Sequence, residues 1–483
     1  MLKFVVADAQ KYSLSPKVID DAGYEYVRVI GQDEDGFYLL QSNLSLNTSR
    51  DRIGFRNRKY KIGYYDFNMN EKWTRKLEDE ADNFNIDVVT MFNDHPMVLR
   101  SQWVKSENTI TFSVEMIDSK GSGFNKKQPG KISYARESDL EKARVIVSKN
   151  NETACIVLQE IRSNDQVLHF ITVDTSLSKA RTYDPIVPYS EKQLEITEVA
   201  ISDQGEISVL SVQEEKVPDE KRKKQMRYKL FMLQADATSF SEKAVTSGDK
   251  QLTEASLTLD NNNRKAVVAG FYNDNDSYTG TGVVFASWSL NGNAEPEIKT
   301  VSIDDNARIK LIGERNSGSN TGLYSYPIRK LVLRSDGGAV VIAEAAYYSE
   351  YSYYDYFTQS FTRRIEYHYD NVVIMSIHTN GTIDWSAVLR KSQESLDDGG
   401  VFSSFTSVLQ SNRIDLIYNK DLSRNNAVGL FTVDNKGVSD QSNVSSSESS
   451  IYILPQSGKQ VDENTLIVAA IQKKKLYLMK VEL

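Results

Sequence analysis

Three observations predict an all-β fold built from repeated four-stranded sheets. A polar turn followed by a short apolar strand occurs eight times along the chain. A second signal, an apolar strand that ends in a polar turn, follows most of these occurrences. No helical periodicity of any length competes with the two signals. Because four-stranded sheets repeated around an axis form a β-propeller, we predict an all-β β-propeller of eight four-stranded blades, with seven blades as the alternative.

The first signal marks the start of each unit. Its strand half alternates or is wholly apolar, as in a strand buried on one or both faces. The eight segments are DEDGFYLLQ (33–41), NDHPMVLRS (93–101), NNETACIVLQ (150–159), SDQGEISVLSV (202–212), DNNNRKAVVAGF (260–271), SDGGAVVIAEA (335–345), QSNRIDLIY (410–418) and DENTLIVAAI (462–471).

The second signal supplies the turn between the last two strands of a unit. A polar side chain that can bond its own backbone, or a glycine at positive φ, suits such a tight turn. Asp66, Asp118, Asp174 and Asp434 fall at the same point of this pattern. The turn DFNMNEKW also aligns with HTNGTIDW, which places Asn68 with Asn380 and Trp73 with Trp385.

The eighth unit is incomplete, because after LYLMKVEL no fourth strand follows. An open edge strand is a liability that proteins usually cover. We therefore expect residues 2–6 or 11–18 to supply the missing strand, so that the N- and C-terminal strands pair and close the ring. Residues 1–483 then form a single β-propeller domain, with blades at 24–80, 84–137, 141–191, 194–248, 251–305, 308–391, 400–445 and 450–483 plus an N-terminal strand from 1–18.

Composition excludes several classes of partner. The chain has 66 acidic and 58 basic residues and a net charge of −8, whereas nucleic-acid binding needs a positive footprint. Membrane-spanning helices need about 20 consecutive apolar residues, and no run approaches that length. We expect a monomer without a transmembrane segment that binds no nucleic acid.

The sequence contains no catalytic signature. Cys155 is the only cysteine, so neither an internal disulfide nor a cysteine-based zinc site can form, and we expect its side chain to be buried. The four histidines lack metal-ligand spacing, and residues 274–277 lack the glycine and closing glutamate of a calcium loop. There is no P-loop, GxSxG or HExxH motif. We expect no catalytic residue, no metal, no cofactor and no enzymatic activity.

The connections between the second and third strands vary in length, and variable loops on a rigid scaffold are where function concentrates. Basic residues gather in three of them, at 45–59, at 213–227 and in the sixth unit. We interpret these clusters as a docking surface for an acidic partner, with solvated surface charge as the alternative. The candidate arginines are Arg50, Arg52, Arg56 and Arg58 in the first unit and Arg363 and Arg364 in the sixth.

The sixth unit also contains an insertion with no counterpart elsewhere. Its tyrosines and arginines match the composition of protein–protein hot spots. Alternatively, the tyrosines pair across the ladder of an extended hairpin, or stack on sugar rings. The aromatic candidates for partner binding are Tyr347, Tyr348, Tyr351, Tyr353, Tyr354, Tyr356 and Phe357.

Several segments resemble a family of exported β-propeller proteins of Bacteroidota. They are GGAVVIAEAAYYSE, DNVVIMSIHTNGTIDWSAVLRKSQES, AVVAGFYNDND and IYILPQSGKQ. The resemblance is one of blade motifs and carries no catalytic residues. It implies a periplasmic or cell-envelope location and, by likeness to the plug protein of the type 9 secretion translocon, a protein partner in the outer membrane. A signal peptide is not evident, because the apolar part of MLKFVVADAQ is too short, so we favour a strand there.

We therefore predict a non-enzymatic protein-interaction propeller of the bacterial envelope, a periplasmic component that binds or plugs an outer-membrane secretion translocon. The alternative is a glycan-binding or glycan-cleaving propeller with aromatic loops at the axial channel. A cleaving enzyme would need carboxylates about 5–10 Å apart there. A quinone-dependent dehydrogenase is a third hypothesis, suggested only by the NGTIDW-type turn.

Overall fold

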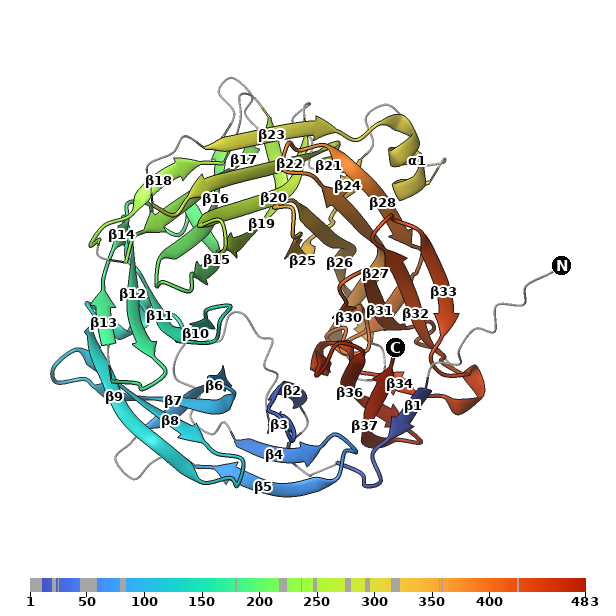
Figure 1. The fold of residues 1–483 in the computed structure, drawn as a ribbon, viewed down its shortest axis with the longest axis horizontal. Helices are drawn as coiled ribbons and strands as arrows, with labels where there is room; N and C mark the ends of the chain where they lie inside the picture. Colours follow the sequence, from blue (N-terminus) through green and yellow to red (C-terminus); the bar gives the residue numbers. More distant parts are fainter. Residues whose placement is uncertain are drawn as a thin grey trace.

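The computed structural model is an all-β propeller, in which sheets stand side by side around a central space (Figure 1). It describes residues 11–19, 23–24, 26–43, 59–78, 84–178, 180–216, 224–235, 237–245, 250–273, 279–291, 296–313, 322–355, 357, 359–423 and 425–483. Within these ranges, no helix is long and apolar enough to cross a membrane.

The described strands form eight sheets of four or five strands, and we number these sheets along the chain. The first contains β2 (Tyr26–Gln32), β3 (Gly36–Ser42), β4 (Tyr60–Asp66) and β5 (Glu71–Leu77). The second contains β6 (Asn85–Phe92), β7 (His95–Val104), β8 (Thr109–Ile117) and β9 (Gly123–Ser133). The third contains β10 (Arg144–Val147), β11 (Thr153–Ile161), β12 (Gln166–Asp174), β13 (Ala180–Tyr183) and β14 (Ile186–Val187). The fourth contains β15 (Leu194–Ile201), β16 (Ile207–Lys216), β17 (Lys224–Leu233) and β18 (Ser241–Ala244).

The remaining four sheets follow the same antiparallel order. The fifth contains β19 (Gln251–Asp260), β20 (Lys265–Asn273), β22 (Gly282–Ser289) and β23 (Glu297–Ser302). The sixth contains β25 (Ile328–Leu333), β26 (Ala339–Asp355), β27 (Ser360–Ile377), β28 (Ile383–Leu389) and β29 (Gln393–Leu396). The seventh contains β30 (Phe405–Leu409), β31 (Arg413–Asn419), β32 (Val428–Asp434) and β33 (Ser439–Asn443). The eighth contains β34 (Tyr452–Ile453), β35 (Lys459–Gln460), β36 (Thr465–Gln472), β37 (Lys475–Glu482) and β1 (Lys11–Leu14).

Strand β1 is the outer strand of the eighth sheet. It pairs antiparallel with β37, from Lys11 opposite Glu482 to Leu14 opposite Met479. The described N-terminal strand therefore comes from the 11–18 segment, and residues 2–6 lie outside the described part of the chain.

The core lies between the sheets. Each of eight clusters of buried side chains joins two sheets that are neighbours in sequence or, in one case, the eighth sheet and the first. That last cluster contains Phe37, Leu39 and Leu478, all fully buried. Cys155 is buried in the cluster between the third and fourth sheets, as expected.

The aspartates of the predicted turns cap their own backbone. In three of these turns, one carboxylate oxygen accepts bonds from the amides two and four residues later, which closes the turn locally. Asp66 accepts from Asn68 and Asn70, Asp118 from Lys120 and Ser122, and Asp434 from Lys436 and Val438, at 2.8–2.9 Å.

Each of the two aligned tryptophans donates to the equivalent turn of the sheet that follows it. Trp73 Nε1 donates to the Ser119 carbonyl at 2.6 Å, and Trp385 Nε1 donates to the Asn435 carbonyl at 3.0 Å. Each acceptor directly follows the turn aspartate of the neighbouring sheet. The alignment of these two turns therefore corresponds to a repeated contact between sheets.

Short elements that the sequence did not predict join the sheets. Helix α1 (Asp305–Ile312) follows the fifth sheet, and Asp304 caps its N-terminus by accepting from the Ala307 amide at 2.9 Å. Only Leu311 of this helix is buried, so two turns give little amphipathic periodicity to detect. The other short elements are the two-stranded sheet of β21 (Thr279–Gly280) and β24 (Leu323–Tyr324), and 3₁₀ turns at Glu137–Asp139, Ser447–Ser449 and Pro455–Ser457.

Candidate functional site

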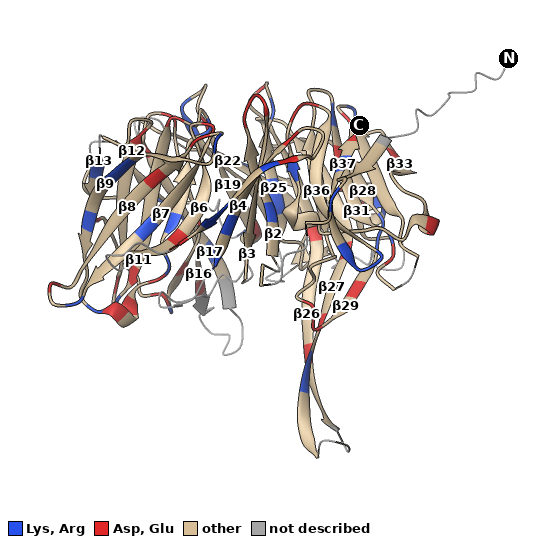
Figure 2. Cartoon of the chain, turned by 90° about the horizontal axis from the view of Figure 1, so that it is seen from below, with Lys and Arg blue, Asp and Glu red and all other residues tan. Residues whose placement is uncertain are grey.

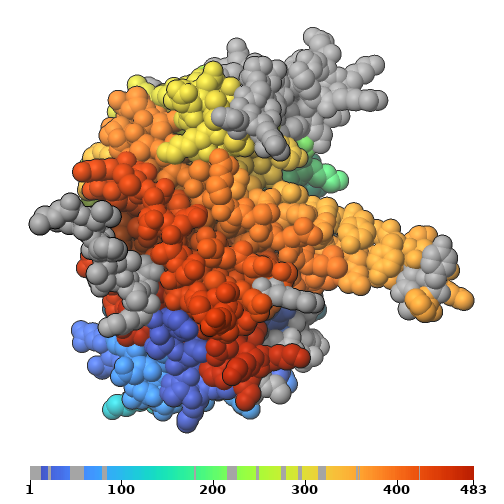
Figure 3. Space-filling view, turned by 90° about the vertical axis from the view of Figure 1, so that its right-hand side faces the viewer, coloured from blue at the N-terminus to red at the C-terminus, as the bar shows by residue number. Residues whose placement is uncertain are grey.

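The insertion of the sixth sheet is a long antiparallel hairpin made by β26 and β27. It projects from one face of the propeller (Figure 2). The space-filling view shows that its outer part stands clear of the remaining surface (Figure 3). A register shift between Glu344 and Ala346 divides the ladder in two. We call residues 346–355 and 360–369 the outer hairpin, and residues 339–344 and 372–377 the inner hairpin.

Side chains of the outer hairpin alternate between its two faces. Because directly opposed residues of antiparallel strands share a face, Tyr347 and His368 lie together, and their rings stack with centroids 4.6 Å apart. Tyr354 and Phe361 lie on the opposite face and meet edge to face at 5.3 Å. Cross-strand pairing of the aromatics, one of the three interpretations of the insertion, is therefore present.

Pairing leaves much of the aromatic surface exposed. Phe357 is 100% exposed and Tyr348 is 69% exposed, although large aromatic side chains are usually substantially buried. The other exposed aromatic residues of the outer hairpin are Tyr347, Tyr351, Tyr353, Tyr354 and Phe361. Exposed aromatic side chains gathered on one projecting element are typical of interaction sites.

The arginines of the outer hairpin are neutralised within the sixth sheet and the segment that follows it. Arg363 pairs with Glu350, and Arg364 pairs with Asp397. The Ile365 amide and the Arg364 guanidinium lower the pKa of Asp397, and the pKa of Arg364 is raised by Tyr353 and Asp397. The outer hairpin thus presents aromatic rings beside internally paired charges, which favours an aromatic or apolar complement over an acidic one.

The inner hairpin rests on a buried ionic network. The Glu344 carboxylate, which is fully buried, lies 2.9 Å from Arg329 Nε and 2.9 Å from Lys391 Nζ, and accepts from Ser404 Oγ at 2.6 Å. Burial lowers the pKa of Lys391. Since Ser404 follows the sixth sheet and precedes β30, this network fixes the hairpin base against the seventh sheet.

The other predicted binding residues lie outside the described part of the chain. They are Tyr356 and the loop arginines Arg50, Arg52, Arg56 and Arg58. Residues 274–278, and residues 217–223 of the basic stretch 213–227, are likewise not described.

Sequence reasoning missed a buried cluster in the third sheet. The His169 imidazole lies 2.7 Å from Asp184 and 3.4 Å from Glu160, whose other partners are Arg162 and the Ala135 amide, each at 2.7 Å. Burial opposes ionisation of Glu160, but these donors lower its pKa overall. Each side chain of the cluster has at least one partner, although Arg162 Nε is buried without one, so we interpret the cluster as a structural network. Its members come from two strands and three loops, and no sequence spacing indicated it.

The inner strands of the fourth and fifth sheets carry two neighbouring carboxyls. Glu198 accepts from the Leu257 amide at 2.7 Å, and Glu254 accepts from the Ile328 amide at 3.3 Å. Each carboxyl therefore bonds the inner strand of the next sheet. Burial, together with Glu198, raises the pKa of Glu254 to about 7. No metal-binding group of three or more His, Cys, Asp or Glu side chains occurs in the described ranges.

No protein-family model matches this chain, and no curated protein sequence matches it. Among solved structures, the WD40 domain of SCAP from fission yeast is 10% identical, with a TM-score of 0.41 and 98% of both chains covered. The β-propeller domain of the trilobed protease from Pyrococcus furiosus is 8% identical, with a TM-score of 0.38 and coverage of 87% of this chain and 98% of that one. A protein of unknown function from Bacteroides caccae is 10% identical, with a TM-score of 0.28 and coverage of 74% and 92%. These scores are too low for the neighbours to carry an argument about function.

Proposed function

We propose that this chain is a non-enzymatic protein-interaction propeller whose outer hairpin enters a groove of a partner protein. The observation that carries the proposal is the combination of exposed aromatic rings with arginines paired inside the sixth sheet and the segment that follows it. Aromatic side chains with few rotatable bonds give large contact area at low entropic cost, and charges that are already paired need no partner charge. The partner groove is therefore aromatic or apolar.

The proposal includes the ring itself. Eight sheets act as eight blades, and the pairing of β1 with β37 closes the ring as the outer strand of the last blade. The buried cluster between the eighth and first sheets supports this arrangement. A closed ring gives the hairpin base a rigid platform, which limits the conformational cost of binding.

The cellular setting is part of the same proposal. On the resemblance of its blade segments to exported Bacteroidota propellers, we place the chain in the periplasm, with an outer-membrane secretion translocon as its partner. The glycan alternative has weaker support, because the exposed tyrosines lie on a hairpin that projects away from the ring (Figure 2).

Site-specific photo-crosslinking tests the proposal. A photo-reactive phenylalanine analogue replaces Phe357 at the tip, and in a matched control it replaces Phe124, which is 39% exposed on the second sheet. In cells of the native host, we expect a discrete protein adduct from position 357 and none from position 124. The adduct should disappear when Tyr351, Tyr353 and Phe361 are changed to serine.

A deletion separates binding from folding. Removing residues 349–366 and joining the ends with a short turn should leave the melting temperature nearly unchanged while abolishing partner capture. If the shortened chain unfolds, the hairpin is structural, and the proposal loses its main support.

A further inference from the structure

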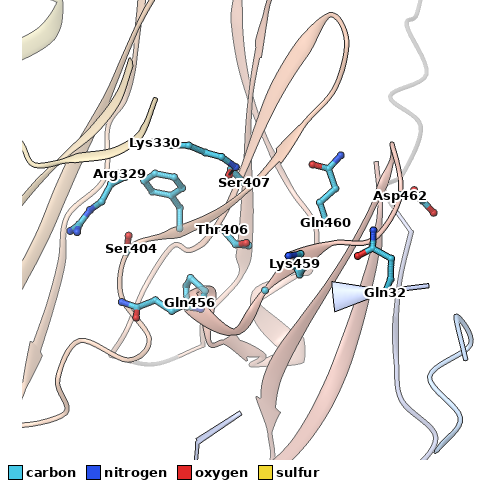
Figure 4. Close-up of a pocket in the computed structure, with 13 residues that line it drawn as sticks. Gln32, Arg329, Lys330, Ser404, Thr406, Ser407, Gln456, Lys459, Gln460 and Asp462 are labelled. Carbon is cyan, nitrogen blue, oxygen red and sulfur yellow. Dashed lines mark hydrogen bonds between the residues drawn. The ribbon is translucent and has the colours of Figure 1, made fainter. Parts of the chain in front are cut away.

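A cavity of about 850 Å³ lies between the innermost strands of the first, sixth, seventh and eighth sheets. Residues of β2, β25, β30 and β35, with the segment 455–458, line it (Figure 4). We call it the axial cavity. Its volume falls within the range of pockets that hold small molecules. No residue of the outer hairpin lines it, although the Arg329 guanidinium of its wall lies 5.5 Å from the centre of the Tyr369 ring at the base of that hairpin.

Two ammonium groups from different sheets line this cavity, and neither forms an ion pair within the described ranges. Lys330 Nζ donates to Ser407 Oγ at 3.1 Å, and Lys459 Nζ donates to the Ile30 carbonyl at 3.3 Å. Both acceptors are neutral, so they leave the positive charges uncompensated. The lining includes one acid, Asp462, whose carboxylate accepts from the Asn464 amide at 2.8 Å.

The two lysines also lie close to other cations. Burial lowers the pKa of Lys330, and Lys459 lowers it further. Burial likewise lowers the pKa of Lys459, and Arg28 of β2 adds to this effect. Both lysine side chains and Arg28 are solvent-exposed, so water screens part of their repulsion, and an anion bound between the lysines would remove the rest.

Several arginines of the described structure have carboxylate partners. Arg329, which also lines the cavity, is paired with the buried Glu344. Arg264 pairs with Glu206, and Arg413 pairs with Asp415. These arginines have carboxylate partners, whereas Lys330 and Lys459 have none in the described ranges. An open pocket with unneutralised cations in its wall attracts an anionic ligand.

We propose that the axial cavity binds a small organic anion that carries two or more oxyanion groups, phosphate or carboxylate. Lys330 and Lys459 bind the oxyanions as point charges, and Arg28, a cation near Lys459 outside the lining, adds attraction at longer range. Gln32 and Thr406, which line the same cavity, offer neutral hydrogen-bonding groups. The ligand supplies the counter-charge that these cations lack.

Thermal unfolding of the full chain tests the proposal, with inorganic tripolyphosphate and citrate as separate probes. Sodium chloride at matched ionic strength is the solvent control. Because a ligand that binds only the folded state stabilises it by mass action, we expect a saturable rise in melting temperature with one or both probes. A response to tripolyphosphate alone indicates a phosphate ligand, and a response to citrate alone indicates a carboxylate ligand.

Substitutions test whether Lys330 and Lys459 bind the probe. Lys330→Gln and Lys459→Gln should each weaken binding about tenfold or more, because each removes a charge-assisted bond. Without probe, both variants should be at least as stable as the parent, since like-charge repulsion falls. The control is Lys473→Gln with Lys474→Gln, which removes two charges from an exposed turn of the eighth sheet. Lys330→Arg, which keeps the charge, should retain binding.

Three results would overturn the proposal. The first is a response to neither probe, and the second is a rise no greater than that in sodium chloride. The third is an equal response in the parent, the Lys330→Gln and Lys459→Gln variants and the turn control. Isothermal titration of the same variants reports binding directly, so a variant that is itself destabilised still gives a decisive result.

Discussion

The inner and outer hairpins are halves of the same two strands, yet different forces hold them. In the inner hairpin, Val341, Ile342, Val373 and Ile374 are fully buried, and Glu344 sits in an ionic network. In the outer hairpin, the two strands are packed mainly against their own side chains. Folding stability should therefore come from the inner half, and partner binding from the outer half.

Replacing Glu344 with alanine should have the largest effect. The substitution leaves the buried Lys391 and the nearby Arg329 without their carboxylate, and an uncompensated buried charge costs about 3–5 kcal/mol. Chemical denaturation measures the loss. Ser404→Ala is the matched control, because it removes one neutral donor to the same carboxylate and should cost about 1 kcal/mol. Equal losses in the two variants would mean that the network does not hold the inner hairpin.

The next largest effect should be the pH dependence of folding stability that Glu254 causes. Glu254 accepts from the first amide of β25, and burial raises its pKa to about 7. The folded chain therefore binds this proton more tightly than the unfolded chain, in which the pKa is about 4.3. The contribution of this group to stability is fully present at low pH and falls as pH rises toward about 7.

Glu254→Gln should remove this dependence. Relative to the parent, the variant should gain about 3 kcal/mol of stability between pH 4.5 and pH 8, as measured by denaturation at both values. Glu350→Gln, on the outer hairpin, is the control and should show no comparable gain. If the parent and Glu254→Gln change in parallel with pH, then the carboxyl does not titrate in this window.

The smallest effect should come from the outer ion pair. Arg364→Ala, Asp397→Ala and the double variant form a cycle in which we expect the two effects on stability to be nearly additive, because both groups are solvated. Partner capture should survive Asp397→Ala, since the aromatic rings carry the contact. Clearly non-additive effects would show that the outer hairpin needs this pair for its structure, and the inner half would then not be the sole source of stability.

Features with local causes were predictable from sequence. The turn aspartates act on amides two and four residues away, so the pattern contains both partners. The insertion was recognisable because nothing like it recurs in the other units. The two tryptophans were aligned from sequence alone, but their acceptors in the neighbouring sheet were not predicted.

Features that depend on long-range register were not predictable. Arg364 and Asp397 are 33 residues apart, and only the docking of the segment after β29 against β27 brings them together. The sequence therefore suggested an acidic partner for Arg363 and Arg364, whose charges are already paired with Glu350 and Asp397. The walls of the axial cavity come from four sheets, so its lysines had no shared motif. Helix α1 is too short to show a periodicity.

The pairing of β1 with β37 has a consequence for folding kinetics. The Leu478 amide donates to Ser15 Oγ at 3.1 Å across 463 residues, whereas strands within the other sheets are close in sequence. Local pairings form quickly, but a contact of such separation forms slowly and late. On a ribosome, the first seven sheets can assemble as they emerge, while β1 must wait for the last residues. The eighth sheet should therefore be the final one to acquire protection from hydrogen exchange.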